Sequence, residues 1–235
     1  MAGDEFDADV LLHLQGVWAW WPEPRRYIDE VYQAFRRGGR YRDSVERKNR
    51  CVRIRYANLC HVDVVPYLLR GPFREKVIVN HAENRFEPAD PDGFTAWIHR
   101  QNRRANGKLI KTIRLYKYLR DRTDAFAIPS VILTTLLGKQ TRWWWDTLFS
   151  YPDLPTAFKI ITARLDNWLH QYSSLPRIPD PSGSGASFQH RWNDRSFQHF
   201  QIEVNKLNHA VTRAYAETNQ IASVLMWKRV FGPAF

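Results

Sequence analysis

Two acidic residues near the start of the chain have the spacing of a cation site. Asp7 and Asp9 lie two positions apart in FDADVLLHL, whose pattern predicts a strand over residues 6–14. Side chains two apart on a strand point to the same face, so the two carboxylates would lie side by side. Such a pair of like charges is costly unless a cation joins it, and Mg2+ prefers carboxylate oxygen. Taken alone, however, such a pair more often marks a solvated strand end.

A third carboxylate lies in another predicted strand. Asp63 occurs in HVDVVP, between Val62 and Val64, where an acidic side chain is expensive to bury without a partner. If the strands at 6–14 and 61–66 are neighbours, Asp63 joins the paired carboxylates in one cluster. Three carboxylates of this kind could hold two metal ions for phosphoryl or nucleotidyl transfer.

A basic helix and a hydroxyl group could supply the complementary contacts to phosphate. The segment KLIKTIRLYKYLRD, residues 108–121, predicts a helix on which Arg114 and Lys117 are neighbours. Basic side chains of this kind bind triphosphate oxygens, although they also suit an ordinary exposed face. Ser130 follows Pro129 at the start of VILTTLLG. Its hydroxyl suits either a helix N-cap or a phosphate held at a helix N-terminus.

The elements that must position these residues fall into two regions. Residues 1–89 mix predicted strands with a helix, which favours an α+β core. Residues 90–235 carry apolar residues at helical spacing and predict a helical domain. Its Pro-, Gly- and Ser-rich stretch at 173–188 predicts a loop. The predicted helices cover residues 24–37, 92–104 and 108–121, a segment that begins near Pro155, and a segment that contains Phe197 to Val211.

Composition and charge narrow the class of protein. The chain has 235 residues, of which 44% are hydrophobic, and this excludes a mostly disordered protein. No apolar run approaches the ~18 residues of a membrane-spanning helix, and the acidic start is not a secretory signal. Two cysteines, Cys51 and Cys60, cannot form a disulfide framework or a four-ligand zinc site. We therefore expect both to be small apolar residues in strands, in a protein of the reducing cytoplasm. The net charge of +11 suggests a polyanionic partner, such as nucleic acid, nucleotide phosphates or an anionic membrane.

Several strings occur together in a characteristic order: FDADVLLHL, HVDVVPYL, EPADPDGFTAW, KLIKTIRLYKYLRD and PSVILTTLLG, followed by IPDPSGSGASFQHRW and WKRVFGPAF. Over nearly the whole chain they resemble the bacterial cyclic GMP-AMP synthase-like and dinucleotide-cyclase-like nucleotidyltransferases, the CD-NTase or SMODS family. The resemblance implies a polymerase-β-like nucleotidyltransferase core packed on a helical domain. It also implies a cytoplasmic enzyme that joins nucleoside triphosphates into cyclic messengers, which activate antiphage effectors. On this resemblance we expect effector and regulatory proteins as partners, no membrane, and no requirement for nucleic acid.

The resemblance also assigns roles to individual residues. It implies two Mg2+ ions, replaceable by Mn2+, held by the catalytic carboxylates Asp7, Asp9 and Asp63. It implies that Lys117 and Ser130 hold the donor triphosphate, with Arg114 as a further candidate. The family often has a base-stacking Tyr directly after that Ser, whereas this chain has Val131. On this interpretation Asp63→Ala abolishes synthesis and leaves the fold intact.

The family's Gly-Ser motif, which cradles the triphosphate, precedes the paired Asp residues. This chain begins only six residues before Asp7, so we expect an N-terminally incomplete core. We hypothesise that Met1 is an internal methionine of a longer protein, which an in-frame stop codon immediately upstream would contradict.

Two alternatives to a cyclic oligonucleotide synthase remain open. One is nucleotidyl transfer to RNA or protein, and the other is a truncated, inactive module that binds nucleotides or nucleic acid.

Overall fold

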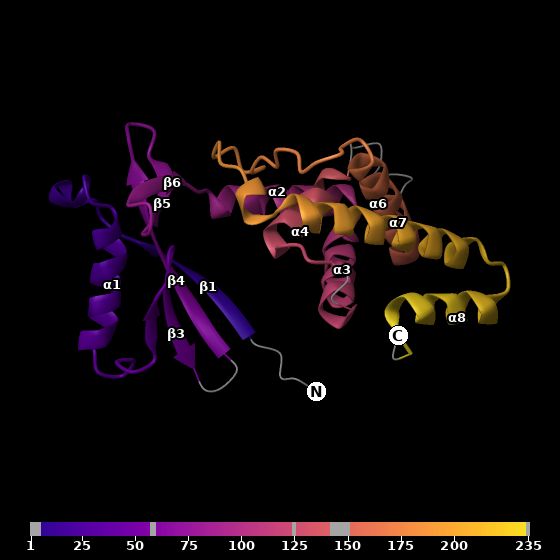
Figure 1. Cartoon of the computed structure of the whole chain (residues 1–235), viewed down its shortest axis with the longest axis horizontal. Coiled ribbons are helices and arrows are strands. Elements are labelled where there is room, and N and C mark those ends of the chain that lie inside the picture. Colours follow the sequence, from indigo (N-terminus) through magenta and orange to yellow (C-terminus); the bar gives the residue numbers. More distant parts are fainter. Residues whose placement is uncertain (1–5, 57–59, 124–125, 142–150, 234–235) are drawn as a thin grey trace. The chain divides into compact units, whose positions relative to one another are not determined.

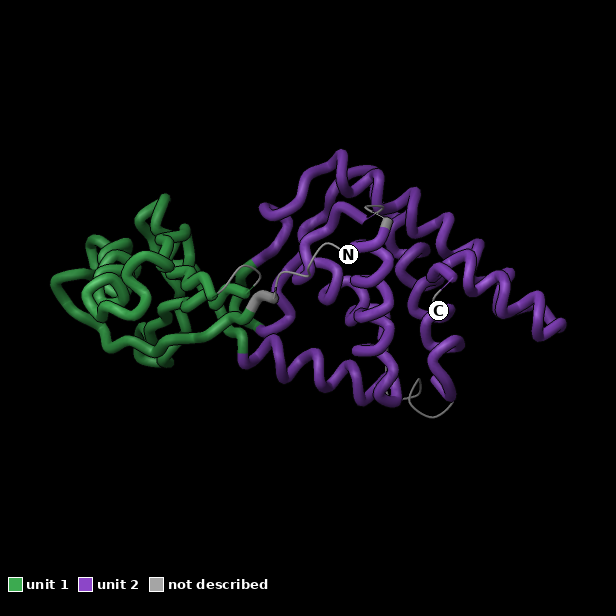
Figure 2. Tube along the Cα trace, turned by 90° about the horizontal axis from the view of Figure 1, so that it is seen from below, with its two compact units in different colours: residues 1–91, 183–186 green, residues 92–182, 187–235 purple. Residues whose placement is uncertain are grey.

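The computed structural model describes residues 6–56, 60–123, 126–141 and 151–233. The chain divides into two compact units (Figure 2). The first comprises residues 1–91 with 183–186, and the second comprises residues 92–182 with 187–235.

The first unit is built on one mixed sheet (Figure 1). Five strands follow one another in the antiparallel order β2-β3-β4-β5-β6, and β1 pairs with β4 in parallel. The expected neighbourhood of the first strand and the strand of Asp63 is therefore confirmed. The strands are β1 (Phe6–His13), β2 (Val45–Arg47), β3 (Val52–Tyr56), β4 (Cys60–Arg70), β5 (Glu75–Asn80) and β6 (Arg85–Pro88).

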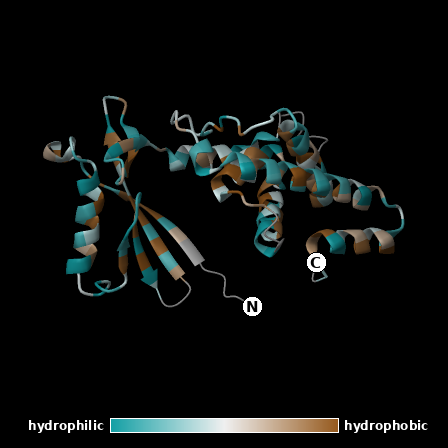
Figure 3. Ribbon diagram, in the orientation of Figure 1, coloured by the Kyte–Doolittle hydropathy of each residue, from teal (hydrophilic) through white to brown (hydrophobic). Residues whose placement is uncertain are grey.

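One face of this sheet carries the core of the first unit. Helix α1 (Arg25–Arg37) buries Tyr27, Ile28 and Val31 in a cluster that also contains strand residues such as Val64. Alternation along β4 directs Val64 and Leu68 into that cluster and Asp63 to the opposite face. Figure 3 shows the same alternation as hydrophilic and hydrophobic bands along the strands. The sheet therefore separates its apolar face from the face that carries the candidate carboxylates.

The second unit is helical, as the sequence pattern predicts. The expected apolar stripes are buried, with Phe158, Ile161 and Leu165 on one helix and Phe200 on another. Its elements are α2 (Pro91–Arg104), α3 (Leu109–Thr123), α4 (Ser130–Lys139), α6 (Leu154–Leu169), the 3-10 turn η3 (Gln189–Arg191), α7 (Asp194–Ala216) and α8 (Gln220–Phe231). In the described part of the chain, no helix is both long enough and apolar enough to cross a membrane.

A close approach of two helices fixes the position of α4. A Cβ atom placed on Gly138 would lie 2.4 Å from Cη2 of Trp97, which belongs to α2. The missing side chain of Gly138 therefore allows α4 to lie directly against the indole ring. This contact matters for the site because Ser130 is the first residue of the same helix.

Candidate active site

Two of the three predicted carboxylates lie in one row across the sheet. Asp9 on β1 is in register with Asp63 on β4, and Arg53 on β3 is in register with Asp63 from the other side. Paired residues on adjacent strands project to the same face, so the row runs Asp9, Asp63, Arg53. Asp7 lies two positions before Asp9, opposite His61, and the structure describes only its backbone. The sheet thus brings together two candidate metal ligands from segments about fifty residues apart in sequence.

Arg53 forms a two-pronged ion pair with Asp63. Its Nε and Nη2 donate to Oδ1 and Oδ2 of the carboxylate at 2.7 and 2.8 Å. These side chains are only 27% and 12% exposed, respectively. The hydrogen bonds from Arg53 lower the pKa of Asp63, which keeps this carboxylate ionised. Sequence reasoning missed Arg53, although its alternation with Val52 and Ile54 places it on the non-core face.

The carboxylates fit a hard divalent cation. Asp63 accepts two hydrogen bonds from Arg53, whereas a carboxylate offers about four lone-pair sites. The remaining sites are enough for the single oxygen contact that Mg2+ commonly takes from each carboxylate. Among the described side chains no group of three potential ligands is arranged to hold a metal ion. The donor chemistry of Asp9 and Asp63 nevertheless suits magnesium or manganese.

The two cysteines lie in different environments near opposite ends of β3. Cys60 is exposed at the start of β4, and Cys51 is buried one residue before β3, so the expectation of two strand residues holds only for Cys60. Burial, together with the negative charge of Asp63, raises the pKa of the Cys51 thiol to about 12. Cys51 is therefore an inert thiol at neutral pH.

This difference predicts selective alkylation. When the native protein is treated with iodoacetamide at pH 8, we expect Cys60 to be labelled and Cys51 to stay unmodified. The reason is that about one Cys51 thiol in ten thousand is ionised at that pH, and its sulfur is buried. Peptide mass spectrometry measures the two sites separately, and unfolding in guanidinium should make both reactive. Equal labelling of the native protein would contradict the buried position of Cys51.

The predicted phosphate-binding residues belong to the second unit. Helix α3 buries Leu109, Ile113 and Tyr116, whereas Arg114 is exposed and Lys117 is half-buried. Within the described ranges, neither of these two cations has a hydrogen-bond or ion-pair partner. Both charges are thus available to an anionic ligand.

Ser130 does not cap its helix. Pro129 occupies the N-cap position of α4, and no side chain caps the helix there, so the N-cap interpretation of Ser130 is wrong. Instead, Oγ of Ser130 accepts a hydrogen bond from Nη1 of Arg120 at 2.8 Å. Arg120 lies one turn beyond Lys117 on α3, and sequence reasoning did not single it out. Arg120 could have been found from the sequence, because it lies three residues after Lys117 and so on the same face of the helix.

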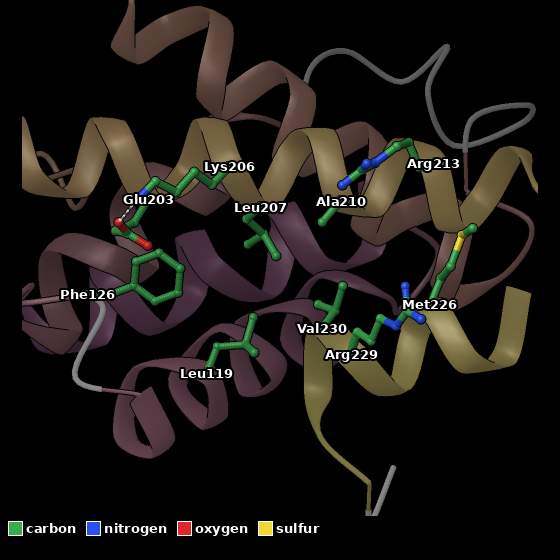
Figure 4. A pocket seen from close by; sticks show the side chains of 10 residues that line it. All are labelled: Leu119, Phe126, Glu203, Lys206, Leu207, Ala210, Arg213, Met226, Arg229 and Val230. Carbon is green, nitrogen blue, oxygen red and sulfur yellow. Dashed lines mark hydrogen bonds and ion pairs between the residues drawn. The ribbon is translucent and has the colours of Figure 1, made fainter.

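A surface pocket of about 410 Å³ lies elsewhere in the second unit, between α3, α7 and α8 (Figure 4). Its lining combines apolar side chains such as Leu207 and Val230 with the basic Lys206, Arg213 and Arg229. Lys206 is already paired with Glu203 at 2.7 Å. None of the predicted site residues lines this pocket, so it is not the expected nucleotide site.

The family model and the curated relatives that match this chain all describe oligonucleotide or dinucleotide synthases. Residues 1–102 match the Second Messenger Oligonucleotide or Dinucleotide Synthetase domain, SMODS. The chain is 23% identical to a c-di-GMP synthase of Roseivirga ehrenbergii, an alignment that covers 87% of this chain and 60% of that protein. The chain spans about three fifths of the length of the curated relatives that it matches.

Solved structures confirm the fold. The chain resembles the CD-NTase CdnG of Bradyrhizobium diazoefficiens in complex with GTP, with a TM-score of 0.71 and 18% identity over 98% of this chain and 76% of that one. It also resembles the cyclic AMP-GMP synthase DncV of Vibrio cholerae in complex with a linear intermediate. There the TM-score is 0.70, and 17% identity extends over 99% of this chain and 64% of that one. The expected α+β class with a polymerase-β-like nucleotidyltransferase core is therefore confirmed.

Proposed function

We propose that the chain is a CD-NTase that joins nucleoside triphosphates into a cyclic oligonucleotide messenger. The observation that carries this proposal is the register of Asp9 with Asp63 on the face of the sheet opposite the apolar core. The relatives named above are synthases of such products or bind such substrates. The messenger would act on an effector protein in cytoplasmic antiphage signalling.

The carboxylates would hold the divalent metal ions that CD-NTases use. We assign Asp7, Asp9 and Asp63 to two Mg2+ ions, with Mn2+ as a substitute. When bound, these ions supply activation of the acceptor ribose hydroxyl and neutralisation of charge on the triphosphate and pyrophosphate. Arg53 keeps Asp63 ionised and fixes the orientation of its carboxylate, so this ligand is ready before a cation arrives.

The helical unit would hold the donor triphosphate. Lys117 and Arg114 carry charges without partners among the described residues, and Ser130 presents a hydroxyl at the start of α4. The first helical hydrogen bond of α4 runs from the N–H of Leu133 to Pro129, so earlier N–H groups face the helix end. That end favours an anion. Val131 is partly packed into the helical core and offers no aromatic ring for base stacking.

A product assay tests this function. We expect purified protein with labelled ATP, GTP, CTP and UTP and Mg2+ to form label that resists phosphatase, because a cyclic product has no terminal phosphate. Asp63→Asn protein and a reaction with EDTA are the controls. Phosphatase-sensitive label alone would contradict cyclisation.

The alternatives predict different products. Label on added RNA or protein would support nucleotidyl transfer to a macromolecule. Binding of NTPs without any product would support a non-catalytic binding module. The register of Asp9 with Asp63 favours a catalytic site over such a module, because a binding module has no need for adjacent carboxylates.

A further inference from the structure

We propose that Arg120 is a positioning residue that orients the Ser130 hydroxyl as a hydrogen-bond donor to the substrate triphosphate. The proposal rests on the proposed function, because it takes the triphosphate as the ligand of Ser130. It adds Arg120 to the residues already assigned to the triphosphate, which are Lys117, Arg114 and Ser130. The contact that carries it is the 2.8 Å hydrogen bond between Nη1 of Arg120 and Oγ of Ser130.

The direction of this hydrogen bond is fixed by chemistry. A guanidinium group has only donors, whereas a serine hydroxyl both donates and accepts. Oγ of Ser130 must therefore accept from Arg120, and its hydrogen must point elsewhere. In the described part of the chain, Arg120 is the sole hydrogen-bond partner of this hydroxyl, and the hydroxyl donates to no acceptor there. The hydrogen is left for an external acceptor, and a phosphate oxygen is one.

A hydroxyl on a helix usually returns its hydrogen to a carbonyl one turn back. Thr135, on the same helix, does this with the carbonyl of Val131 at 2.7 Å. Ser130 is the first residue of the helix, so the chain before it is not helical. The carbonyl groups three and four residues before Ser130 accept hydrogen bonds from other donors. The carbonyl of Phe126 accepts from the N–H of Ile128, and that of Ala127 accepts from Nε1 of Trp192 at 2.8 Å.

The surroundings hold this arrangement in place. Arg120 is only 24% exposed, and its Nε donates to Asp121 at 2.7 Å. Its Nη1 also lies 3.4 Å from the carbonyl oxygen of Ile128, in the segment that leads into α4. Phe126 and Ile128 are buried in the helical core on either side of Ala127. Ser130 therefore needs little ordering when a ligand binds, which favours affinity.

Affinity measurements in a double-mutant cycle test the proposal. Calorimetry with nonhydrolysable ATP and GTP analogues gives the dissociation constant of each variant. We expect Arg120→Met and Ser130→Ala each to weaken binding by about tenfold to a hundredfold, the effect of one hydrogen bond to a charged group. Because Arg120 acts through Ser130, the double variant should bind about as weakly as Ser130→Ala alone. Arg120→Lys should restore part of the affinity, since an ammonium group also donates.

Two controls separate positioning from general effects. Arg122→Met removes an equal charge from an exposed position on the same helix and should leave the affinity within about twofold. Unfolding midpoints of all variants show whether Arg120→Met merely disturbs the fold. Unchanged affinity in Arg120→Met would overturn the proposal, and so would losses that multiply in the double variant. If the wild-type protein binds no nucleoside triphosphate, the proposed function fails as well, whereas normal binding by an Arg120→Met protein overturns this inference alone.

Discussion

Asp63→Asn should reduce the rate of cyclic oligonucleotide formation by at least about a thousandfold, with the fold retained. The substitution keeps the size of the side chain and removes its negative charge. A metal site of this kind contributes several kcal/mol to transition-state stabilisation, and about 4 kcal/mol corresponds to a thousandfold in rate. The measurement is the initial rate of phosphatase-resistant product, together with the number of Mn2+ ions bound per chain in the absence of NTP.

The ion pair with Arg53 determines which variant is informative. Asp63→Ala leaves a guanidinium of 27% exposure without its carboxylate, so the structure predicts a loss of stability in addition to the loss of activity. Asn retains one oxygen that accepts from Arg53, and we expect it to cost only about 1–2 kcal/mol. The expectation from sequence that Asp63→Ala spares the fold should therefore be tested separately, by its unfolding midpoint.

Glu46→Gln is a matched control on the same sheet. Glu46 on β2 pairs with Lys48 and Arg55, and these partners lower its pKa, as Arg53 does for Asp63. Glu46 lies in register with Arg53, at the end of the row away from Asp9, and it is not a candidate ligand. Its neutralisation should therefore leave both the rate and Mn2+ binding near wild type. If Asp63→Asn protein that is folded keeps its rate and its Mn2+ stoichiometry, Asp63 is not a metal ligand.

Gly138→Ala should destabilise the helical unit by about 2 kcal/mol, although alanine is the better helix former. The added Cβ would lie 2.4 Å from Cη2 and 2.9 Å from Cζ3 of Trp97, a rigid ring that is only 8% exposed. Overpacking of this kind typically costs about 1–3 kcal/mol, and it outweighs the gain of about 1 kcal/mol from helix propensity. For a chain of this size the melting temperature should fall by about 4–8 °C. Differential scanning calorimetry measures that change.

Trp97→Phe is the suppressor that tests the mechanism. The clashing atoms belong to the six-membered ring of the indole, and phenylalanine does not reach as far. Trp97→Phe alone should be destabilising because it leaves a cavity against Gly138. In the double variant the two losses should be clearly less than additive, since the new methyl group fills that space. Additive losses, or a Gly138→Ala protein as stable as wild type, would contradict the close packing of α4 against α2.

Local pattern was sufficient to predict most of the elements. Apolar spacing predicted the long helices of the second unit because each buries one continuous stripe, such as that of Phe158 and Ile161. It missed β2, β6 and α8. The two strands have only three and four residues, too few for alternation to be visible. Helix α8 leaves Ile221 and Leu225 exposed, so its apolar residues do not follow the stripe of a buried face.

The sequence by itself determined the chemistry that is available: carboxylates two apart on a strand, an acidic residue in a second apolar strand, and a cationic helix followed by a serine. Those features depend on residue type and short-range periodicity, which the chain displays directly. Only the tertiary structure decided their partners. Arg53 reaches Asp63 through strand register, and Arg120 on α3 reaches Ser130 at the start of α4. Such contacts depend on how separate segments pack, and no local pattern encodes that packing.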